Sequence, residues 1–311
     1  MIRTCPACNE ADGLPWLESP DRYHWRRVAY QLVRCPACSL IWLMNAPDPS
    51  EMPAHYGKEY HHDITQSGEK KASQRWKEHG DVVMHFAHPG AILDIGCSSG
   101  AFLKTMAVEG RKLAGIEIDP EVAETARRNT GAEVFCGDAP DASFPAASFD
   151  VITCVHTLEH QFRPRELVAK VWYWLKPGGI FYVVVPNIDS WEFRLFRSYW
   201  YALEVPRHIT FFSPTSLRRI GEQAGFRVDR MITRADCHLE ASTKYVFDEM
   251  REKMGLTVRP LADVSSPALP WRVVRKAIRM TGILAFRQIA SASGHGASLG
   301  AVFTKPFPAA Q

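Results

Sequence analysis

Short apolar runs alternate with amphipathic stretches from residue 91 to the end of the chain. The amphipathic stretches repeat their apolar positions at helical spacing, whereas the apolar runs have the length of buried strands. The runs predict strands near 91–96, 112–118, 132–136, 149–155, 179–185, 226–233 and 298–304. The stretches predict helices near 99–109, 120–129, 164–175 and 213–224. This alternation is typical of βαβ units, so we predict an α/β fold, a parallel sheet with helices on both faces.

The first of these strands runs directly into a glycine-rich turn, Asp94-Ile95-Gly96-Cys97-Ser98-Ser99-Gly100. Gly96 lets the chain turn sharply, and Gly100 lets the following helix pack close to the strand. Ligand oxygens can meet backbone N–H groups at the start of that helix. The turn therefore predicts a nucleotide-type pocket, although a glycine cluster alone is equally typical of a tight turn that binds nothing.

Two acidic residues lie where such a pocket needs them. Glu117 ends the second predicted strand about twenty positions after the glycine turn, where a carboxylate can accept both hydroxyls of a ribose. Asp119 precedes Pro120 and is predicted to cap the next helix. Asp138 follows the third strand and can accept from the exocyclic amine of a purine; the alternative is an acidic residue of a surface loop.

Half of the eight cysteines form two identical N-terminal tetrapeptides, Cys5-Pro6-Ala7-Cys8 and Cys35-Pro36-Ala37-Cys38. Each Cys-x-x-Cys turn presents two thiolates to one ion, and two turns complete the tetrahedral sulfur shell of Zn²⁺. The segment from Tyr23 to Arg34 contains enough β-formers for a hairpin between the turns. We predict a structural zinc ribbon; the alternatives are a redox dithiol and two disulfides. The other four cysteines are predicted to be buried apolar side chains: Cys97, Cys136, Cys154 and Cys237.

The 311 residues include 37 Lys and Arg against 34 Asp and Glu, a near-balance that gives no overall signature of nucleic-acid binding. No acidic residue follows Asp263, whereas six basic residues do. Within this basic part, 271–280 predicts a helix that either covers the pocket or makes a peripheral membrane contact through 271–287. We expect a cytoplasmic protein, because no secretory signal or bilayer-spanning run is evident.

Three histidines follow the fourth and fifth predicted strands. His156 and His160 belong to a His-Thr-Leu-Glu-His segment, and His208 follows Arg207 in a later loop. A neutral imidazole near pH 7 can take a proton from a nucleophile, so all three are candidate catalytic bases. The alternative for His156 and His160 is a structural hydrogen bond, and the alternative for His208 is packing against Phe212. Arg207 is a candidate partner for an anionic group.

In their order and spacing, these motifs resemble those of class I S-adenosylmethionine-dependent methyltransferases, in particular the subgroup that acts on small molecules. The resemblance covers about residues 90–235. It rests on Asp94-x-Gly96-x-Ser98-x-Gly100, Gly115–Asp119, Gly137-Asp138, Ser148–Ile152 and Leu175–Gly179. Ser98 stands where the family often has a middle glycine. The resemblance implies a Rossmann-like seven-stranded sheet whose last strand is reversed, and Ala297 to Lys305 is the candidate for that strand.

The resemblance also implies that S-adenosyl-L-methionine is the methyl donor. It places Gly96 and the neighbouring backbone near the methionine moiety, Glu117 on the ribose and Asp138 near the adenine. A Leu-Glu-His segment at this place borders the donor in the family, and Tyr56 and Tyr60 are candidate lid residues. The donor-binding candidates are Asp94, Gly96, Cys97, Gly100, Glu117, Asp138, Ala139 and His156.

The sequence thus predicts a zinc ribbon (1–45), a linker and helical cap (46–89), a methyltransferase core (90–240), a helical insertion (241–297), and a last strand with tail (298–311). The predicted function is methyl transfer to an oxygen or carbon of a small molecule, such as a sugar, a polyketide-like compound or an anionic or lipid-linked intermediate. The family's Asn/Asp-Pro-Pro-Tyr/Phe motif for amino nitrogens is absent. One alternative is an RNA methyltransferase whose ribbon grips RNA; another is a non-catalytic scaffold that retains the donor pocket. The basic residues of the ribbon that permit RNA binding are Arg22, Arg26, Arg27 and Arg34.

Overall fold

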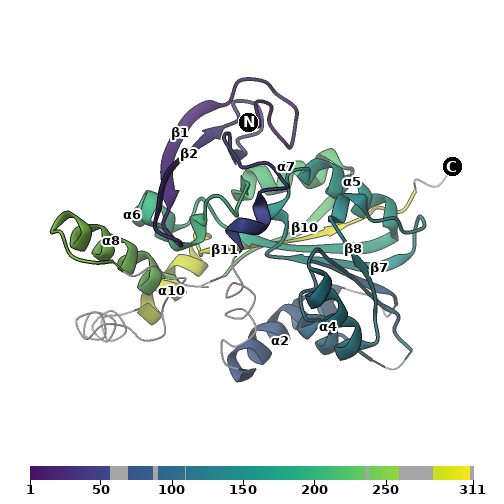
Figure 1. Cartoon of the computed structure of the whole chain (residues 1–311). Coiled ribbons are helices and arrows are strands. Elements are labelled where there is room, and N and C mark those ends of the chain that lie inside the picture. Colours follow the sequence, from purple (N-terminus) through teal and green to yellow (C-terminus); the bar gives the residue numbers. More distant parts are fainter. Residues whose placement is uncertain (57–68, 87–89, 109, 235–237, 259–282, 309–311) are drawn as a thin grey trace.

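The computed structural model describes residues 1–56, 69–86, 90–108, 110–234, 238–258 and 283–308. A large sheet of seven strands forms its centre (Figure 1). The strands lie in the order β10-β11-β8-β7-β4-β5-β6. Their bounds are β4 (Ile92–Ile95), β5 (Leu113–Glu117), β6 (Glu133–Cys136), β7 (Phe149–Val155), β8 (Leu175–Pro186), β10 (Arg227–Arg234) and β11 (Ser298–Thr304).

The directions of these strands confirm the predicted Rossmann-like methyltransferase topology. β8, β7, β4, β5 and β6 are parallel neighbours, whereas β11 runs antiparallel between β10 and β8. All four residues of β4 are buried, as are the last eight of β8. Such continuous apolar runs arise because both faces of a parallel sheet are covered.

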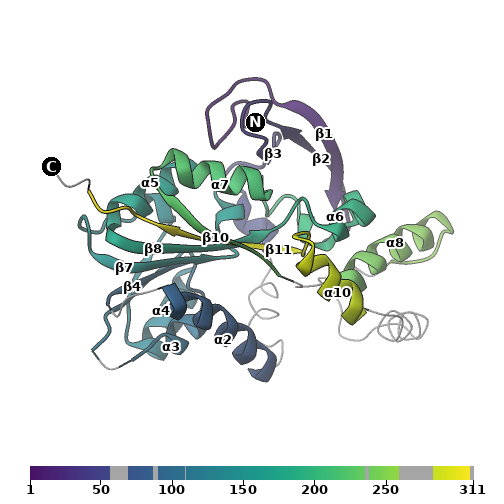
Figure 2. The same ribbon diagram turned by 180° about the vertical axis from the view of Figure 1, so that it is seen from behind.

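Helices cover both faces of the large sheet (Figures 1 and 2). On one face lie α5 (Pro164–Trp174) and α7 (Pro214–Gln223). On the other lie α2 (Glu69–Phe86), α3 (Ala101–Thr105) and α4 (Pro120–Thr130). α3 is shorter than predicted and cannot begin before Ala101, because Gly100 adopts φ +81°.

Three further helices lie beyond the end of the sheet near β11 (Figure 2). They are α6 (Trp191–Phe196), α8 (Leu239–Lys253) and α10 (Ile283–Ala292). The predicted basic helix at 271–280 lies outside the described residues. Within the described part of the chain, none of the helices has the length and apolar character needed to span a bilayer.

The N-terminal ribbon forms a second sheet, in the order β1-β2-β3-β9. Its hairpin begins earlier than predicted: β1 (Leu14–Asp21) pairs with β2 (Arg26–Arg34), and Tyr23 lies in the turn. β3 (Ile41–Leu43) pairs with β2 and with β9 (Thr210–Phe211), a short strand that lies between β8 and α7 in the sequence. The ribbon and the α/β region therefore share one small sheet, and a single hydrophobic cluster joins ribbon side chains such as Trp42 to those of α7.

Two of the four remaining cysteines fit the burial predicted for them. Cys97 and Cys154 are buried. Cys136 is exposed, and that prediction was wrong because Cys136 ends β6, the edge strand of the large sheet. Cys237 lies outside the described residues.

Candidate functional site

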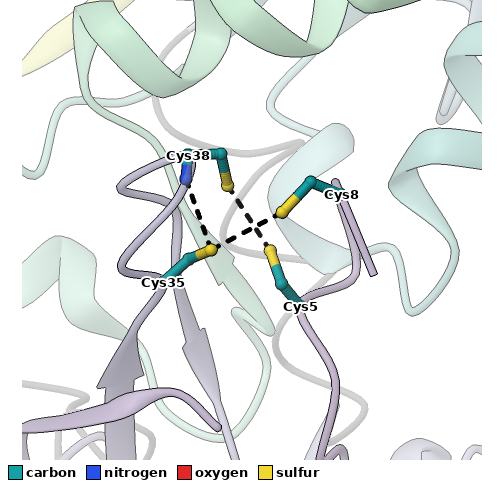
Figure 3. Close-up of side chains that lie close together, drawn as sticks. All are labelled: Cys5, Cys8, Cys35 and Cys38. Atoms are coloured by element: carbon teal, nitrogen blue, oxygen red, sulfur yellow. Dashed lines mark hydrogen bonds between the residues drawn. The ribbon is translucent and has the colours of Figure 1, made fainter. Parts of the chain in front are cut away.

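The four cysteines of the ribbon come together although they belong to two distant tetrapeptides (Figure 3). The Sγ atoms of Cys5 and Cys38 are 3.5 Å apart, as are those of Cys8 and Cys35. All four sulfur atoms lie within 4.8 Å of one another. The two turns share a backbone pattern, because the first cysteine of each donates its N–H to the carbonyl oxygen five residues later. The repeated sequence is thus a repeated structure.

This cluster of sulfur atoms fits a Zn²⁺ ion. Four Zn–S bonds of about 2.3 Å in a tetrahedron separate the sulfur atoms by about 3.8 Å, close to the observed spacing. The N–H of Cys38 donates to Sγ of Cys35 at 3.3 Å. Burial raises the pKa of Cys8 to about 11, so a metal ion is what would hold this thiol deprotonated at neutral pH.

The glycine turn between β4 and α3 is tied to β5 by its backbone. The N–H groups of Gly96 and Cys97 donate to the carbonyl oxygen of Ile116, and that of Ser98 donates to Oε2 of Glu117 at 2.9 Å. These three N–H groups are already bonded within the protein. Glycine is required at position 96 by the fold: Gly96 has φ +74°, and a Cβ there would lie 2.1 Å from Oγ1 of Thr157, which packs against the turn.

Two carboxylates lie at the ends of β4 and β5 beside this turn. Glu117 is 7% exposed, and its oxygens accept from the N–H groups of Ser98 and Asp119. Each oxygen keeps a further lone pair, so ribose hydroxyls can still donate to Glu117. Asp94 accepts from Oγ1 of Thr153 at 2.6 Å, and burial raises the pKa of Asp94 to about 7.

The side chain of Asp119 caps α4, as the sequence predicted. Its Oδ1 accepts from the N–H groups of Glu121 and Val122. Glu117 is therefore the acidic residue at the end of β5 that can face a ligand.

Asp138, after β6, is held by an arginine that the sequence analysis missed. Nη2 of Arg163 donates to Asp138 at 2.9 Å and to Asp141 at 2.7 Å. Arg163 lies 25 positions away from Asp138 at the start of α5, and no local pattern marks it as a partner. The adjacent Ala139 is buried. The pair orients the Asp138 carboxylate at the same rim of the sheet.

Two imidazoles meet next to the donor-side residues. His160 ends a short 3₁₀ helix (Leu158–His160) after β7, and His208 lies just before β9; their ring centroids are 4.7 Å apart. Nδ1 of His160 is 3.0 Å from the carbonyl oxygen of Arg207, and Nδ1 of His208 is 2.9 Å from that of Ala202. Because a carbonyl oxygen only accepts, each Nδ1 carries the proton and each Nε2 carries a lone pair.

Burial keeps both imidazoles neutral. Desolvation lowers the pKa of His160 and of His208 to about 4. Glu159 is buried beside them, and an oxygen of Glu204 lies 3.8 Å from Nε2 of His208. These carboxylates stabilise the imidazolium that proton uptake creates, so the pair can act as a general base at neutral pH.

The same cluster also has the spacing of a metal site. One ligand atom each from Glu159, His160 and His208 lies within 4.8 Å of the others. Oε2 of Glu159 is buried without a hydrogen-bond partner among the residues that the structure describes. The cluster can therefore take up a proton or a divalent cation, and metal content distinguishes the two.

Two further candidates contact this cluster. Oη of Tyr56 lies 3.0 Å from Nδ1 of His160, and burial raises the pKa of Tyr56 well above its usual range. His156 adopts φ +54°, which is uncommon for a residue with a side chain, and its Nδ1 lies 3.3 Å from Oε1 of Glu159. Thus His160 and His208 are adjacent, whereas His156 reaches them through Glu159. Tyr60 lies outside the described residues.

Arg207 does not fit the expected contact with an anionic ligand. Its side chain is fully buried, with Nε 3.4 Å from Oε2 of Glu204 and Nη1 3.9 Å from Oδ1 of Asp21. That expectation was wrong, because the sequence shows the charge of Arg207 but not the ribbon residues that fold over it.

Known proteins match the α/β part of the chain. A family model described as a methyltransferase domain matches residues 69–230, just over half of the chain. A ubiquinone biosynthesis O-methyltransferase of Aromatoleum aromaticum is 28% identical over 153 residues, which is 45% of this chain and 65% of that protein. One of Burkholderia pseudomallei is 30% identical over 158 residues, 46% of this chain and 68% of that protein. The match thus spans slightly less than two thirds of the Aromatoleum protein and slightly more than two thirds of the Burkholderia protein.

The fold also matches solved structures. A crystal structure described as a SAM dependent methyltransferase from Archaeoglobus fulgidus has a TM-score of 0.53 at 20% identity. The match covers 80% of this chain and 100% of that chain. At this identity the match bears on the fold alone.

Proposed function

This chain belongs to the S-adenosylmethionine-dependent methyltransferase family, and from that premise we propose that it methylates an oxygen or carbon atom of a small molecule. The pair of neutral, buried imidazoles carries this proposal. β7 leads to His160 and β4 leads to the glycine turn, and these strands are parallel neighbours. A proton acceptor therefore lies beside the expected position of the donor.

On the side of the methyl donor, the chain supplies hydrogen-bond acceptors. S-adenosylmethionine carries an electrophilic methyl group on a sulfonium. In this proposal the Glu117 carboxylate accepts hydrogen bonds from the ribose hydroxyls, and the backbone of Gly96 and its neighbours lies beside the methionine moiety. Asp138, oriented by Arg163, accepts from the adenine amine. Asp94, Cys97, Gly100, Ala139 and His156 complete the proposed donor site.

On the acceptor side, the chain aligns the nucleophile and removes its proton. The acceptor oxygen or carbon forms a bond to the methyl carbon while the methyl–sulfur bond breaks, and that electron pair stays on sulfur as a thioether. The acceptor's proton moves to Nε2 of His208 or His160. Glu159 and Glu204 then stabilise the imidazolium.

The arginines of the ribbon favour a small-molecule acceptor over RNA. Nη1 of Arg22 donates to Oε2 of Glu249 at 2.8 Å, and Arg27 pairs with Glu249 and Glu252. Helix α8 therefore neutralises two of the four basic residues on which RNA binding would depend. The names of the relatives, which specify O-methyltransferases, support an oxygen acceptor.

The donor site is tested by calorimetric titration of S-adenosylmethionine. Glu117→Ala is expected to weaken binding by about 1–3 kcal/mol, roughly 5- to 150-fold, because a charged hydrogen-bond partner of the ribose is lost. Glu121→Ala removes an exposed acid from the adjacent first turn of α4 and should leave the affinity unchanged. Equal affinity of Glu117→Ala and the wild type would contradict the assigned ribose contact.

The acceptor class is tested with methyl-labelled S-adenosylmethionine and a fractionated cell extract. Label is expected in the small-molecule fraction and should be insensitive to ribonuclease. Ribonuclease-sensitive label would favour the RNA alternative. Donor binding without labelling of any fraction would favour the non-catalytic scaffold.

A further inference from the structure

We infer that the ribbon is part of the catalytic site: the tip of its hairpin, Asp21 to His24, positions the loop that carries Arg207 and His208. Through the Arg207 carbonyl oxygen, this tip fixes the proton on Nδ1 of His160. The inference rests on the proposed function, since it assigns positioning residues to the proposed base.

The hairpin tip packs against the buried guanidinium of Arg207, whose Nη1 also donates to the carbonyl oxygen of His55 at 3.3 Å. Oδ1 of Asp21 lies 3.9 Å from Nη1 of Arg207, and Nδ1 of His24 lies 3.3 Å from the same nitrogen. Cζ of Arg207 lies 4.3 Å from the centroid of the Tyr23 ring. Within the tip, Asp21 holds His24 through its backbone N–H at 3.2 Å and through Nδ1 at 3.0 Å. Because the Asp21 carboxylate only accepts, Nδ1 of His24 carries a proton, and its approach to Nη1 of Arg207 is a packing contact. The charge of Arg207 is met from the tip by the Asp21 carboxylate and by the Tyr23 ring.

Charge balance makes this contact specific. The side chains of Asp21 and Arg207 are both fully buried. A guanidinium removed from water needs anions close by, and Arg207 has Glu204 on its own loop and Asp21 on the ribbon. Of the two carboxylates that pair with Arg207 among the described residues, loss of Asp21 would leave that of Glu204, and this weaker charge balance favours movement of the loop toward solvent.

The backbone of this loop transmits its position to the imidazoles. The carbonyl oxygen of Arg207 accepts from Nδ1–H of His160 at 3.0 Å. The N–H of Ile209 donates to the carbonyl oxygen of Glu159 at 2.8 Å, and its own carbonyl oxygen accepts from Leu43 of ribbon strand β3 at 2.9 Å. If the loop moves, Nδ1 of His160 loses its carbonyl acceptor and keeps only the Tyr56 hydroxyl, which can donate to it as well as accept. The proton can then shift to Nε2, and His160 loses the lone pair with which it would serve as base.

Asp21→Asn in the zinc-loaded full chain tests the inference. We expect an unchanged affinity for S-adenosylmethionine, because the proposed donor residues follow or end β4, β5, β6 and β7 and do not lie on the loop that carries Arg207. We expect kcat to fall about 10-fold or more, within the range that a misplaced base can cost. Nitrogen NMR of the histidine-labelled protein reports the tautomer, and the His160 signals are assigned by their loss in His160→Gln. In Asp21→Asn, His160 should change from the Nδ1–H tautomer to a mixture of the Nδ1–H and Nε2–H tautomers.

Glu18→Gln is the matched control, because Glu18 is an exposed acid on the same strand β1. It should change neither kcat nor the tautomer. If Asp21→Asn does not fold, the same measurements are made on His24→Gln, which keeps the buried Asp21 carboxylate but removes the imidazole that it holds. A purely structural role would lower Tm but leave the His160 tautomer and kcat at wild-type values, and that result would overturn the inference. The tautomer is measured without an acceptor, so it tests the inference even if the proposed methyl transfer fails.

Discussion

The His208→Ala variant is expected to lose about two to four orders of magnitude in kcat while binding S-adenosylmethionine as tightly as the wild type. Nε2 of His208 carries a lone pair in a site that excludes water, and the Glu204 carboxylate at 3.8 Å stabilises the protonated ring. The proposed donor-binding residues belong to other strands, so the affinity for S-adenosylmethionine should not depend on the His208 ring. Single-turnover kinetics with an acceptor that the wild type methylates measure the rate of transfer, and calorimetry measures the affinity for S-adenosylmethionine.

His79→Gln is the control for this variant. His79 is as buried as His208 and contacts the hydroxyl of Tyr182 at 2.8 Å, but it lies on α2 away from the histidine pair. Both variants should lower Tm, whereas only His208→Ala should lower kcat. A kcat for His208→Ala within a few-fold of the wild type would show that His208 is not the base and would leave Nε2 of His160 as the candidate proton acceptor of the pair.

The direction of the histidine pKa shift also sets the sign of two pH effects. The folded-state pKa of His208 is about 4, below the usual value of about 6.5 for an unfolded chain. The base should therefore stay neutral, and kcat should stay level, as the pH falls from 8 to about 5. The unfolded state binds more protons between about pH 6.5 and 4, so these histidines make the free energy of unfolding fall on acidification through that range.

Hydrophobic periodicity predicted the large sheet because its strands are local apolar runs. β7 and β11 match the predicted strands residue for residue, and the reversed direction of β11 followed from the family resemblance. β1 was not predicted: Leu14 to Asp21 contains two prolines and alternates poorly. β9 has only two residues and exists because β3 pairs with it, which no local pattern can show.

The same distinction applies to the candidate site. The sequence places the glycine turn, Glu117 and the histidines at strand ends, and the fold brings them to one rim. The sequence could not show that Arg163 pairs with Asp138, which lies 25 positions away, or that Asp21 pairs with Arg207, which lies 186 positions away. Charge is visible in the sequence, but whether a partner neutralises it depends on the tertiary structure.

Removal of the metal from the ribbon should separate methyl transfer from donor binding. Zinc supplies about 10 kcal/mol or more to the folding of small sites, so Cys35→Ser is expected to unfold the ribbon. β9 then loses β3, and Arg207 loses Asp21, whereas the donor residues keep their strands. Methyl transfer should fall below detection while S-adenosylmethionine still binds. Zinc content by mass spectrometry, circular dichroism, calorimetry and a transfer assay measure these outcomes.

Cys136→Ser is the matched control, because Cys136 is an exposed cysteine outside the cluster. It should retain one zinc per chain and full activity. Two metal ions per wild-type chain, one of them lost in His208→Ala, would instead identify Glu159, His160 and His208 as a cation site and replace the general-base role by metal activation of the acceptor. Full methyl transfer by a zinc-free chain would show that the α/β region positions His160 and His208 without the ribbon, because the loop before β9 would then keep its geometry without β3.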